Sequence, residues 1–207
     1  MCLNSTKEPP LHNAGYHNVM FIKDRAMDQD KVEGQIRLLA QIVRCICLKK
    51  ELSKLNPAPE LNFWRVIQGG LLDLSVMEWT KVFGSNVEPT HWKGVVEDQN
   101  KFRAELLDYL DITEQQWSEY WSEMKTYRDE AVAHYFDNEN ISHYPRLDIA
   151  LKSCHFYYGH LIIKLREKGE NKYPDSLEEY CERFTEQTRS IAELAIEATN
   201  DIEESVW

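Results

Sequence analysis

Long apolar runs are missing from this chain. No stretch approaches the roughly 18 to 20 consecutive apolar residues that a membrane-spanning helix needs. The segment from Met1 to Gly15 also lacks the basic stretch followed by an apolar one that marks a secretory leader. These two absences predict a cytoplasmic protein with no membrane partner. The 207 residues suffice for one domain with a sizeable core.

Cysteines are few, and their spacing matches no common metal or disulfide pattern. The five cysteines are odd in number and include no Cys-x-x-Cys pair, which argues against a zinc site and against a disulfide framework. We therefore expect reduced, partly buried thiols. His155 and His160 lie about 140° apart on one helix, so they do not form a metal-binding pair. The prediction is a protein that uses neither a metal nor a cofactor.

Positive charge is in the minority. The chain has 24 lysines and arginines against 35 aspartates and glutamates, which gives a formal net charge of -11 at pH 7. Broad, non-specific affinity for nucleic acid depends on a cationic surface that releases counterions from the phosphates. The acidic balance argues against that behaviour, so any contact with nucleic acid must be local.

Strand-like alternation of apolar and polar residues is also absent, and the apolar period is helical throughout. Turn-forming residues separate the helical blocks in four places, at 56–59, 84–89, 137–145 and 169–174. We predict an all-α fold, a helical bundle of about five main helices with shorter helices near 90–96 and 99–110. Nothing marks a second domain, so residues 1–207 are expected to form one helical domain in which residues 1–13 are loose.

Two segments carry more specific structural predictions. Residues 61–83 are apolar almost all round, which predicts a central buried helix. Gly69 and Gly70 in its middle would let a neighbouring helix approach closely. Thr113 stands three residues before Gln116, the spacing of a capping box, so a helix should begin there.

Arg128 stands where the helix that follows Thr113 is expected to be apolar. At about 100° per residue, one stripe of side chains falls within roughly 60° of a single line along this helix. The stripe consists of Trp117, Trp121, Met124, Arg128, Ala131, Val132 and Tyr135. A desolvated arginine is costly unless it is paired, so the stripe must face a carboxylate, a subunit boundary or a cleft that admits an anion. We predict a homodimer whose interface includes the helix from Thr113 to about Phe136.

The segment from Tyr127 to Phe136 reads YRDEAVAHYF. It resembles the signature of the HEPN superfamily, in which an arginine and a polar residue are followed, a few positions later, by a histidine. Here five residues separate Arg128 from His134, and Asp129 fills the polar position. The place of the segment, late in a long helix of a bundle, is also similar to that family, and in particular to bacterial abortive-infection and toxin-type proteins.

The resemblance implies a metal-independent endoribonuclease that acts at a homodimer cleft, as a toxin or an antiphage-defence effector. RNA carries its own nucleophile, the 2′-hydroxyl, so cleavage would leave a 2′,3′-cyclic phosphate. An imidazole such as His134 can move protons near neutral pH. Arg128 offers a planar fork that matches phosphate oxygens, and Asp129 would orient one of the pair or hold Arg128 when RNA is absent.

The remaining expectations concern partners. On one helix Arg128 and His134 lie roughly 120° and about 9 Å apart, so two copies of the chain would bring four such groups around one cleft. Basic residues near the signature predict a modest phosphate track, namely Lys125, Arg146 and Lys152. Some family toxins are controlled through a tyrosine two residues after the histidine, where this chain has Phe136. An antitoxin or regulatory protein is a further expected partner.

Less specific interpretations stay open. Arg128 could form a buried salt bridge with Asp73 or Glu78. His134 could be a helix-terminal histidine that is paired with Glu130 and favoured by the helix dipole. The alternative function is therefore a non-catalytic helical dimer that binds a partner protein or a nucleotide, and the acidic charge of the chain favours it.

Overall fold

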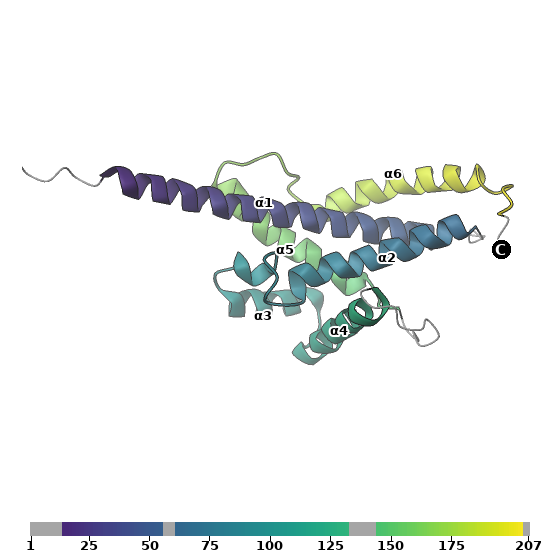
Figure 1. The fold of residues 1–207 in the computed structure, drawn as a ribbon, viewed down its shortest axis with the longest axis horizontal. Helices are drawn as coiled ribbons and strands as arrows, with labels where there is room; N and C mark the ends of the chain where they lie inside the picture. The colour runs from purple at the N-terminus through teal and green to yellow at the C-terminus, as the bar shows by residue number, and fades with distance from the viewer. Residues whose placement is uncertain (1–13, 56–60, 133–143, 205–207) are drawn as a thin grey trace, which may run out of the picture.

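The computed structural model describes residues 14–55, 61–132 and 144–204. These residues form six α-helices, one short 3-10 helix and one π-helical turn, with no strand among them (Figure 1). The elements are α1 (Ala14–Leu52), α2 (Asn62–Phe83), η1 (Trp92–Gly94), α3 (Gln99–Leu110), α4 (Glu114–Tyr127), η2 (Arg128–Val132), α5 (Asp148–Glu167) and α6 (Leu177–Glu197). The predicted all-α helical bundle is confirmed. None of the described helices is long and apolar enough to cross a membrane.

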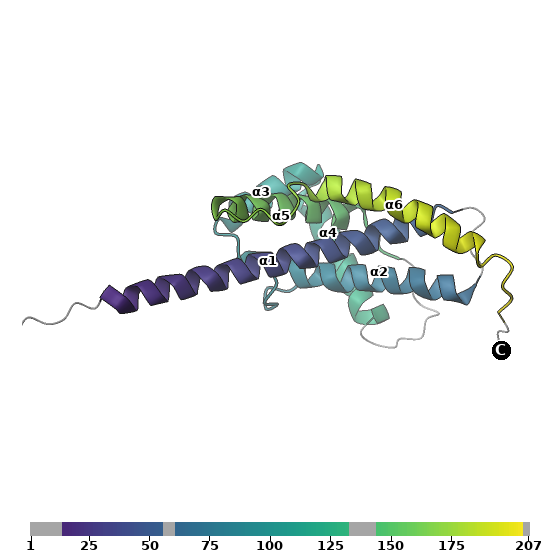
Figure 2. The same cartoon turned by 90° about the horizontal axis from the view of Figure 1, so that it is seen from above.

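Helix α1 runs through the bundle and contacts α2, α5 and α6. Figure 2 shows that α1, α2 and α6 extend along the long direction of the molecule and that the N-terminal part of α1 projects beyond the other helices. The predicted apolar positions of α1 are buried: Val32, Ile36, Leu39, Val43 and Ile46. Because they recur every three or four residues, they line one side of the helix and place it in the core.

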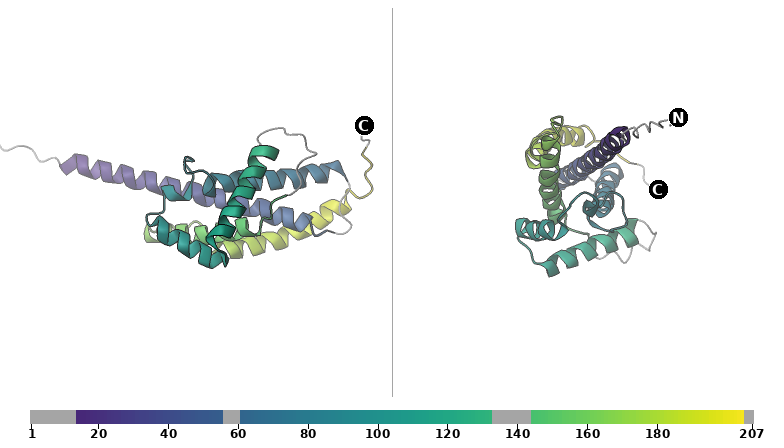
Figure 3. Two further views of the ribbon diagram at one scale, coloured as in Figure 1. Left: turned by 90° about the horizontal axis from the view of Figure 1, so that it is seen from below. Right: turned by 90° about the vertical axis from the view of Figure 1, so that its left-hand side faces the viewer.

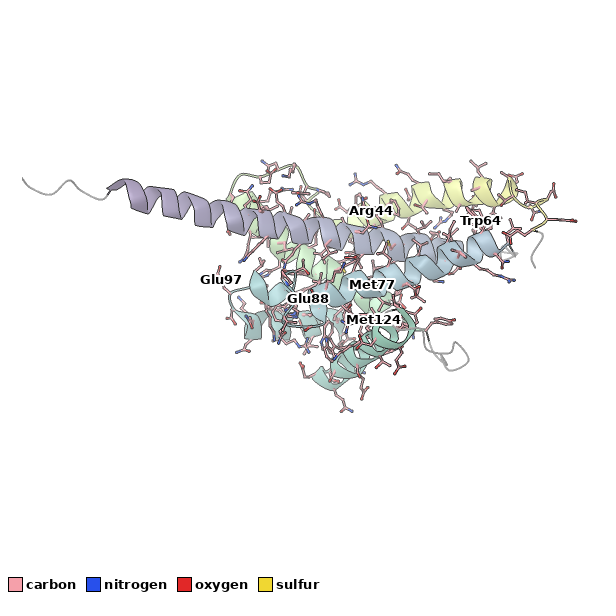
Figure 4. The ribbon with its side chains drawn as sticks, in the orientation of Figure 1. Arg44, Trp64, Met77, Glu88, Glu97 and Met124 are labelled. Carbon is pink, nitrogen blue, oxygen red and sulfur yellow. A yellow bond between two sulfur atoms is a disulfide. The ribbon has the colours of Figure 1, made fainter. Side chains whose placement is uncertain are left out.

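Helices α3 and α4 cover the side of the bundle that faces away from α1, and the right-hand view in Figure 3 shows α4 running across it. Helix α4 packs on α2. Figure 4 shows Met77 of α2 and Met124 of α4 where the two helices cross, and Met124 is fully buried. The ring of Trp79 on α2 lies 5.8 Å from that of Trp117 and 5.5 Å from that of Tyr120, both on α4.

The start of α4 agrees with the sequence prediction. The Thr113 hydroxyl accepts a hydrogen bond from the Gln116 backbone N–H at 3.2 Å, and the Gln116 side chain accepts one from the Thr113 N–H at 2.8 Å. This reciprocal pair satisfies two backbone donors that a helix start leaves open. The capping box therefore fixes where α4 begins and, with it, which side chains face α2.

The buried face of α4 differs from the predicted stripe, which was wrong in its register. The buried residues are Trp117, Tyr120, Met124 and Tyr127. Trp121 is half-buried, and Arg128 lies at the edge of this face with its side chain 24% exposed. Helix α4 packs its buried aromatic residues against α2 of its own chain, and its outward side is polar. The buried part of the stripe therefore gives no support for a homodimer, which stays a prediction.

The prediction that residues 61–83 form a helix buried all round is also wrong. Phe63 and Val66 of α2 are 55% and 72% exposed. A Cβ atom added to Gly69 or Gly70 would meet no atom within 4 Å, so no helix approaches closely there. The neighbours of α2 cover only part of its circumference, and the two glycines leave open space beside it.

The prediction that the cysteines are reduced thiols needs a correction. Cys47 of α1 and Cys181 of α6 form a disulfide, whereas Cys45 and Cys154 are free and buried. The two bonded residues are 134 positions apart in the chain. A search for local spacing patterns cannot find such a pair, because only the packing of α6 on α1 brings it together.

Glu33 of α1 binds the connection between α5 and α6. Its ionisation should make the stability of the protein depend on pH. Its carboxylate accepts hydrogen bonds from Lys172 Nζ at 2.7 Å and from the Tyr173 hydroxyl at 3.2 Å. The Lys172 ammonium holds the pKa of Glu33 at about 2, well below its usual range. A depressed pKa means that this contribution is present above the ordinary glutamate pKa and is lost as pH falls towards about 2.

We expect the free energy of unfolding of the parent to exceed that of Glu33→Gln near neutral pH. The difference should be on the order of 1 kcal/mol, because Lys172 is half exposed and water screens the pair. Denaturant titrations from neutral to strongly acidic pH test this expectation. The difference should shrink as the pH falls, and a difference that stays constant would contradict it.

Candidate functional site

Arg128 lies at the start of a π-helical turn that continues α4. The turn covers Arg128–Val132 and contacts α2. Just before it, the Tyr127 hydroxyl donates a hydrogen bond to Asp73 of α2 at 2.7 Å, and burial raises the pKa of Tyr127, so the phenol remains a donor. π-Helical turns inside helices are frequent at functional sites. The packing of Tyr127 on α2 thus fixes the place from which the Arg128 side chain extends.

The ion-pair partner of Arg128 is its neighbour in sequence. Arg128 Nε and Nη2 lie 2.7 Å and 2.5 Å from Asp129 Oδ1. The expected alternative, a buried salt bridge to α2, is wrong, because Asp73 accepts from Tyr127 instead and Glu78 pairs with Lys81 at 2.7 Å. The Asp129 carboxylate is 44% exposed, so water screens the pair. Arg128 therefore pairs at the edge of the buried face, with its side chain 24% exposed, and not within the core.

His134, the other residue of the predicted pair, lies outside the described residues. Tyr135 and Phe136 lie outside them as well. The chain is described again from Tyr144, whose ring centroid is 6.1 Å from that of Tyr127. Tyr144, the first described residue after Val132, therefore lies beside the residue that precedes Arg128.

A cleft of about 650 Å³ adjoins this place, between the end of α1, the first half of α2 and the start of α5. We call it the basic cleft. It is lined by Lys49, Lys50, Ser53, Lys54, Arg65, Gln68, Gly69, Leu72, Tyr127, Tyr144, Pro145, Leu147 and Asp148. Four of these side chains are cationic and one is acidic. In a chain whose net charge is -11, this gathering makes the cleft locally positive.

Two of the four cations have no carboxylate partner within the described residues. Lys50 pairs with Asp148 at 2.7 Å, and Lys54 pairs with the buried carboxylate of Glu51 at 2.5 Å. Arg65 is exposed, and Lys49 makes only a 3.3 Å hydrogen bond to the Ser53 hydroxyl. Burial lowers the pKa of Lys49. A bound anion would raise the pKa of Lys49 again, because a nearby negative charge favours the charged ammonium. Since Lys49 and Arg65 form no ion pair in the part of the chain that the structure describes, they are the side chains of this cleft that are available to bind a phosphate.

The basic residues predicted from the sequence are not gathered in one place. Arg146 lies at the rim of the basic cleft, where it pairs with Asp148 at 3.3 Å. Lys152 is exposed on the first turns of α5. Lys125 lines a different cleft, with its ammonium 5.3 Å from the centroid of the Trp121 ring. The three cations therefore do not form the phosphate track that was predicted.

The sequence interpretation missed Lys49, Lys50, Lys54 and Arg65. Lys49 and Lys50 lie in the last turn of α1, where a cation is also favoured by the carbonyl end of a helix, and Lys54 follows that end by two residues. Their clustering in sequence was a signal of local positive charge. Its meaning appears only when the fold brings them beside Tyr127, which is more than seventy residues away in sequence.

Metal ligands do not cluster in this region. No group of three or more His, Cys, Asp or Glu side chains that could hold a metal ion occurs in residues 29–55, 61–132 or 144–204. Comparisons of the chain with protein-family models, with curated proteins and with solved structures found no match.

Proposed function

We propose that this protein is an endoribonuclease of HEPN type that cuts single-stranded RNA without a metal ion, with Arg128 and His134 at the reacting phosphate. The observation that carries the proposal is the basic cleft beside the turn that presents Arg128. Tyr127, the residue before Arg128, lines this cleft together with Lys49 and Arg65, so a strand whose phosphates lie along these two cations would pass beside the turn that begins at Arg128. Phosphate contacts of this kind position a nucleic acid and leave the chemistry to nearby groups.

The proposed reaction uses the 2′-hydroxyl of RNA as its nucleophile. His134 moves a proton during the attack of this hydroxyl on the adjacent phosphorus. The bond to the 5′ oxygen of the next nucleotide then breaks, and that oxygen takes up a proton. Arg128 stabilises the negative charge that develops on the phosphate oxygens. The products are a strand with a 2′,3′-cyclic phosphate and a strand with a 5′-hydroxyl.

Asp129 has a positioning role in this proposal. Its carboxylate holds the guanidinium through Nε and Nη2 while no RNA is bound. Because the pair is partly exposed, its exchange for a phosphate costs little. The phosphodiester gains negative charge as the 2′-hydroxyl attacks, so the planar fork of Arg128 binds the reacting phosphate more strongly than the resting strand.

A homodimer remains part of the proposal, because a second copy would add its own Arg128 and His134 to the cleft. The contact would have to use a surface other than the apolar face of α4, which is already buried. Light scattering at micromolar concentration tests this element separately. If the protein cuts RNA as a monomer, the proposed chemistry stands and the proposed cleft shared by two copies is wrong.

The Arg128–Asp129 ion pair also favours a second candidate function, a non-catalytic helical dimer that binds a partner protein or a nucleotide. In that case the pair is a permanent surface contact. The two candidates differ in one experiment, in which purified protein is incubated with a single-stranded RNA and with DNA of the same sequence. We expect RNA to be cut and DNA to stay intact, because DNA lacks the 2′-hydroxyl. Binding of RNA with no cleavage would support the second candidate instead.

A further inference from the structure

A second cleft, of about 620 Å³, lies where the end of α2, the connection to α3, the start of α3 and one side of α4 meet. We call it the tryptophan cleft. It is lined by Phe83, Gly84, Ser85, Asn86, Val87, His91, Trp92, Lys93, Gln99, Asn100, Arg103, Glu114, Trp117, Ser118, Trp121 and Lys125. The walls combine three indoles, three cations, several neutral amides and hydroxyls, and one carboxylate.

Each cation of the tryptophan cleft lies over an indole. The distance from the cationic group to the ring centroid is 5.6 Å for Lys93 over Trp92, and 5.3 Å for Lys125 over Trp121. Arg103, over the third indole at 4.6 Å, is neutralised by Glu114. Within the described residues, neither Lys93 nor Lys125 forms an ion pair. Two uncompensated positive charges thus face one cavity, which suits a ligand with phosphate groups.

The rest of the cavity suits a flat heterocycle. The Trp121 indole N–H donates to the backbone oxygens of Phe83 and Gly84 at 2.9 Å and 3.2 Å, which fixes the ring, and the side chain is only half-buried. Asn86 and Asn100 add amides that can both donate and accept hydrogen bonds at a base edge. The volume is far larger than one phosphate needs, and it falls within the range of small-molecule sites.

We propose that the tryptophan cleft binds one unpaired nucleotide of the RNA strand that is cut at Arg128. The inference rests on the proposed function. Lys125 precedes Arg128 by three residues, and the Arg128 backbone N–H donates to the Lys125 carbonyl, so the two side chains are about one helical turn apart. A strand that leaves Arg128 along α4 therefore meets Lys125 first. The two phosphates that flank this nucleotide bind Lys125 and Lys93, and its base stacks on Trp121 in place of the ammonium.

This arrangement also sets the substrate class. A base in a duplex is stacked and paired, so it cannot enter a cleft in the side of the protein. Recognition through an indole face tolerates every base, whereas the amides of Asn86 and Asn100 add a preference at one position. The proposed enzyme therefore cuts RNA beside a nucleotide that is unpaired.

The test measures binding of a fluorescently labelled, single-stranded 2′-O-methyl oligonucleotide, which has no free 2′-hydroxyl and cannot be cut. We compare the parent with Lys93→Gln/Lys125→Gln, in which both exposed charges are removed, and with Lys31→Gln/Arg183→Gln, which removes two exposed charges elsewhere. We expect the first variant to raise Kd about tenfold and to lower the slope of log K against log salt by about 1.4, the value for two phosphate contacts on a single strand. The second variant should match the parent.

Further outcomes separate the alternatives. Equal binding by the parent and Lys93→Gln/Lys125→Gln would overturn the inference, as would equal affinity for duplex RNA that depends on the same two lysines. If adenosine monophosphate binds as tightly as the oligonucleotide, and if its binding also depends on Lys93 and Lys125, the cleft binds a free nucleotide and the proposed path of the strand is wrong. If the parent binds RNA through Lys93 and Lys125 but does not cut it, the proposed nuclease activity is wrong, and the tryptophan cleft is still a binding site.

Discussion

The Arg128→Lys and His134→Ala variants are each expected to cut RNA about 10² to 10⁴ times more slowly than the parent, the usual effect of losing one proton-transfer or charge-stabilising group. Arg128→Lys keeps the positive charge beside Asp129 but loses the planar fork that matches a phosphate. Single-turnover rates on one synthetic RNA measure the effect, since they report cleavage and not product release.

The matched control is His155→Ala. The His155 side chain is on α5, and its Nε2 atom is buried with no hydrogen-bond partner, so its loss removes no contact of the proposed site. This variant should cut RNA at the rate of the parent. Circular dichroism and thermal unfolding establish that each variant is folded. If folded Arg128→Lys and His134→Ala both cut RNA as fast as the parent, the assignment of these residues is wrong.

Removal of the free cations in the basic cleft is expected to weaken RNA binding with little change in the rate of the bound complex. Lys49→Gln/Arg65→Gln is the informative variant, because neither side chain forms an ion pair within the described residues. Lys54 is a poorer choice, since it pairs with the buried carboxylate of Glu51, which would lose one of its partners. We expect Kd for single-stranded RNA to rise about tenfold and the salt slope to fall by about 1.4.

A steric pair of variants tests the same cleft without a change of charge. Gly69 lines the basic cleft and Gly70 does not, and a Cβ at either position meets open space. Gly69→Phe should block RNA binding, whereas Gly70→Phe places the same side chain one position along α2 and should bind RNA as the parent does. Equal binding by the two variants would show that RNA does not occupy the basic cleft.

The parts of the fold that depend on local pattern were predictable from the sequence. The helical period located the buried side of α1, and the spacing of Thr113 and Gln116 located the start of α4. Both signals depend on residues within a few turns of one helix, where geometry follows from the backbone alone. The register of the buried face of α4 was not predictable in this way. It depends on the aromatic contacts with α2 and on a π-helical turn that the sequence period does not reveal.

In the candidate site, too, the local contacts were predictable from the sequence and the contacts between distant segments were not. Arg128 and its partner Asp129 are adjacent in sequence, and their pairing was among the expectations. The basic cleft depends on α1 and α2 meeting the end of α4, and the tryptophan cleft depends on α4 meeting the connection between α2 and α3. Contacts between distant segments have no local signature. For the same reason the sequence placed Lys125, Arg146 and Lys152 on one track, whereas the fold distributes them over different surfaces.

The most direct measurement for the central claim is an end-group analysis of RNA that has been incubated with the purified parent protein in excess chelator. The proposed chemistry predicts fragments that end in a 2′,3′-cyclic phosphate or its hydrolysis product, matched by fragments that begin with a 5′-hydroxyl, and it predicts that the chelator leaves the rate unchanged. Intact RNA, fragments that begin with a 5′-phosphate, or cleavage that stops on addition of the chelator would contradict it.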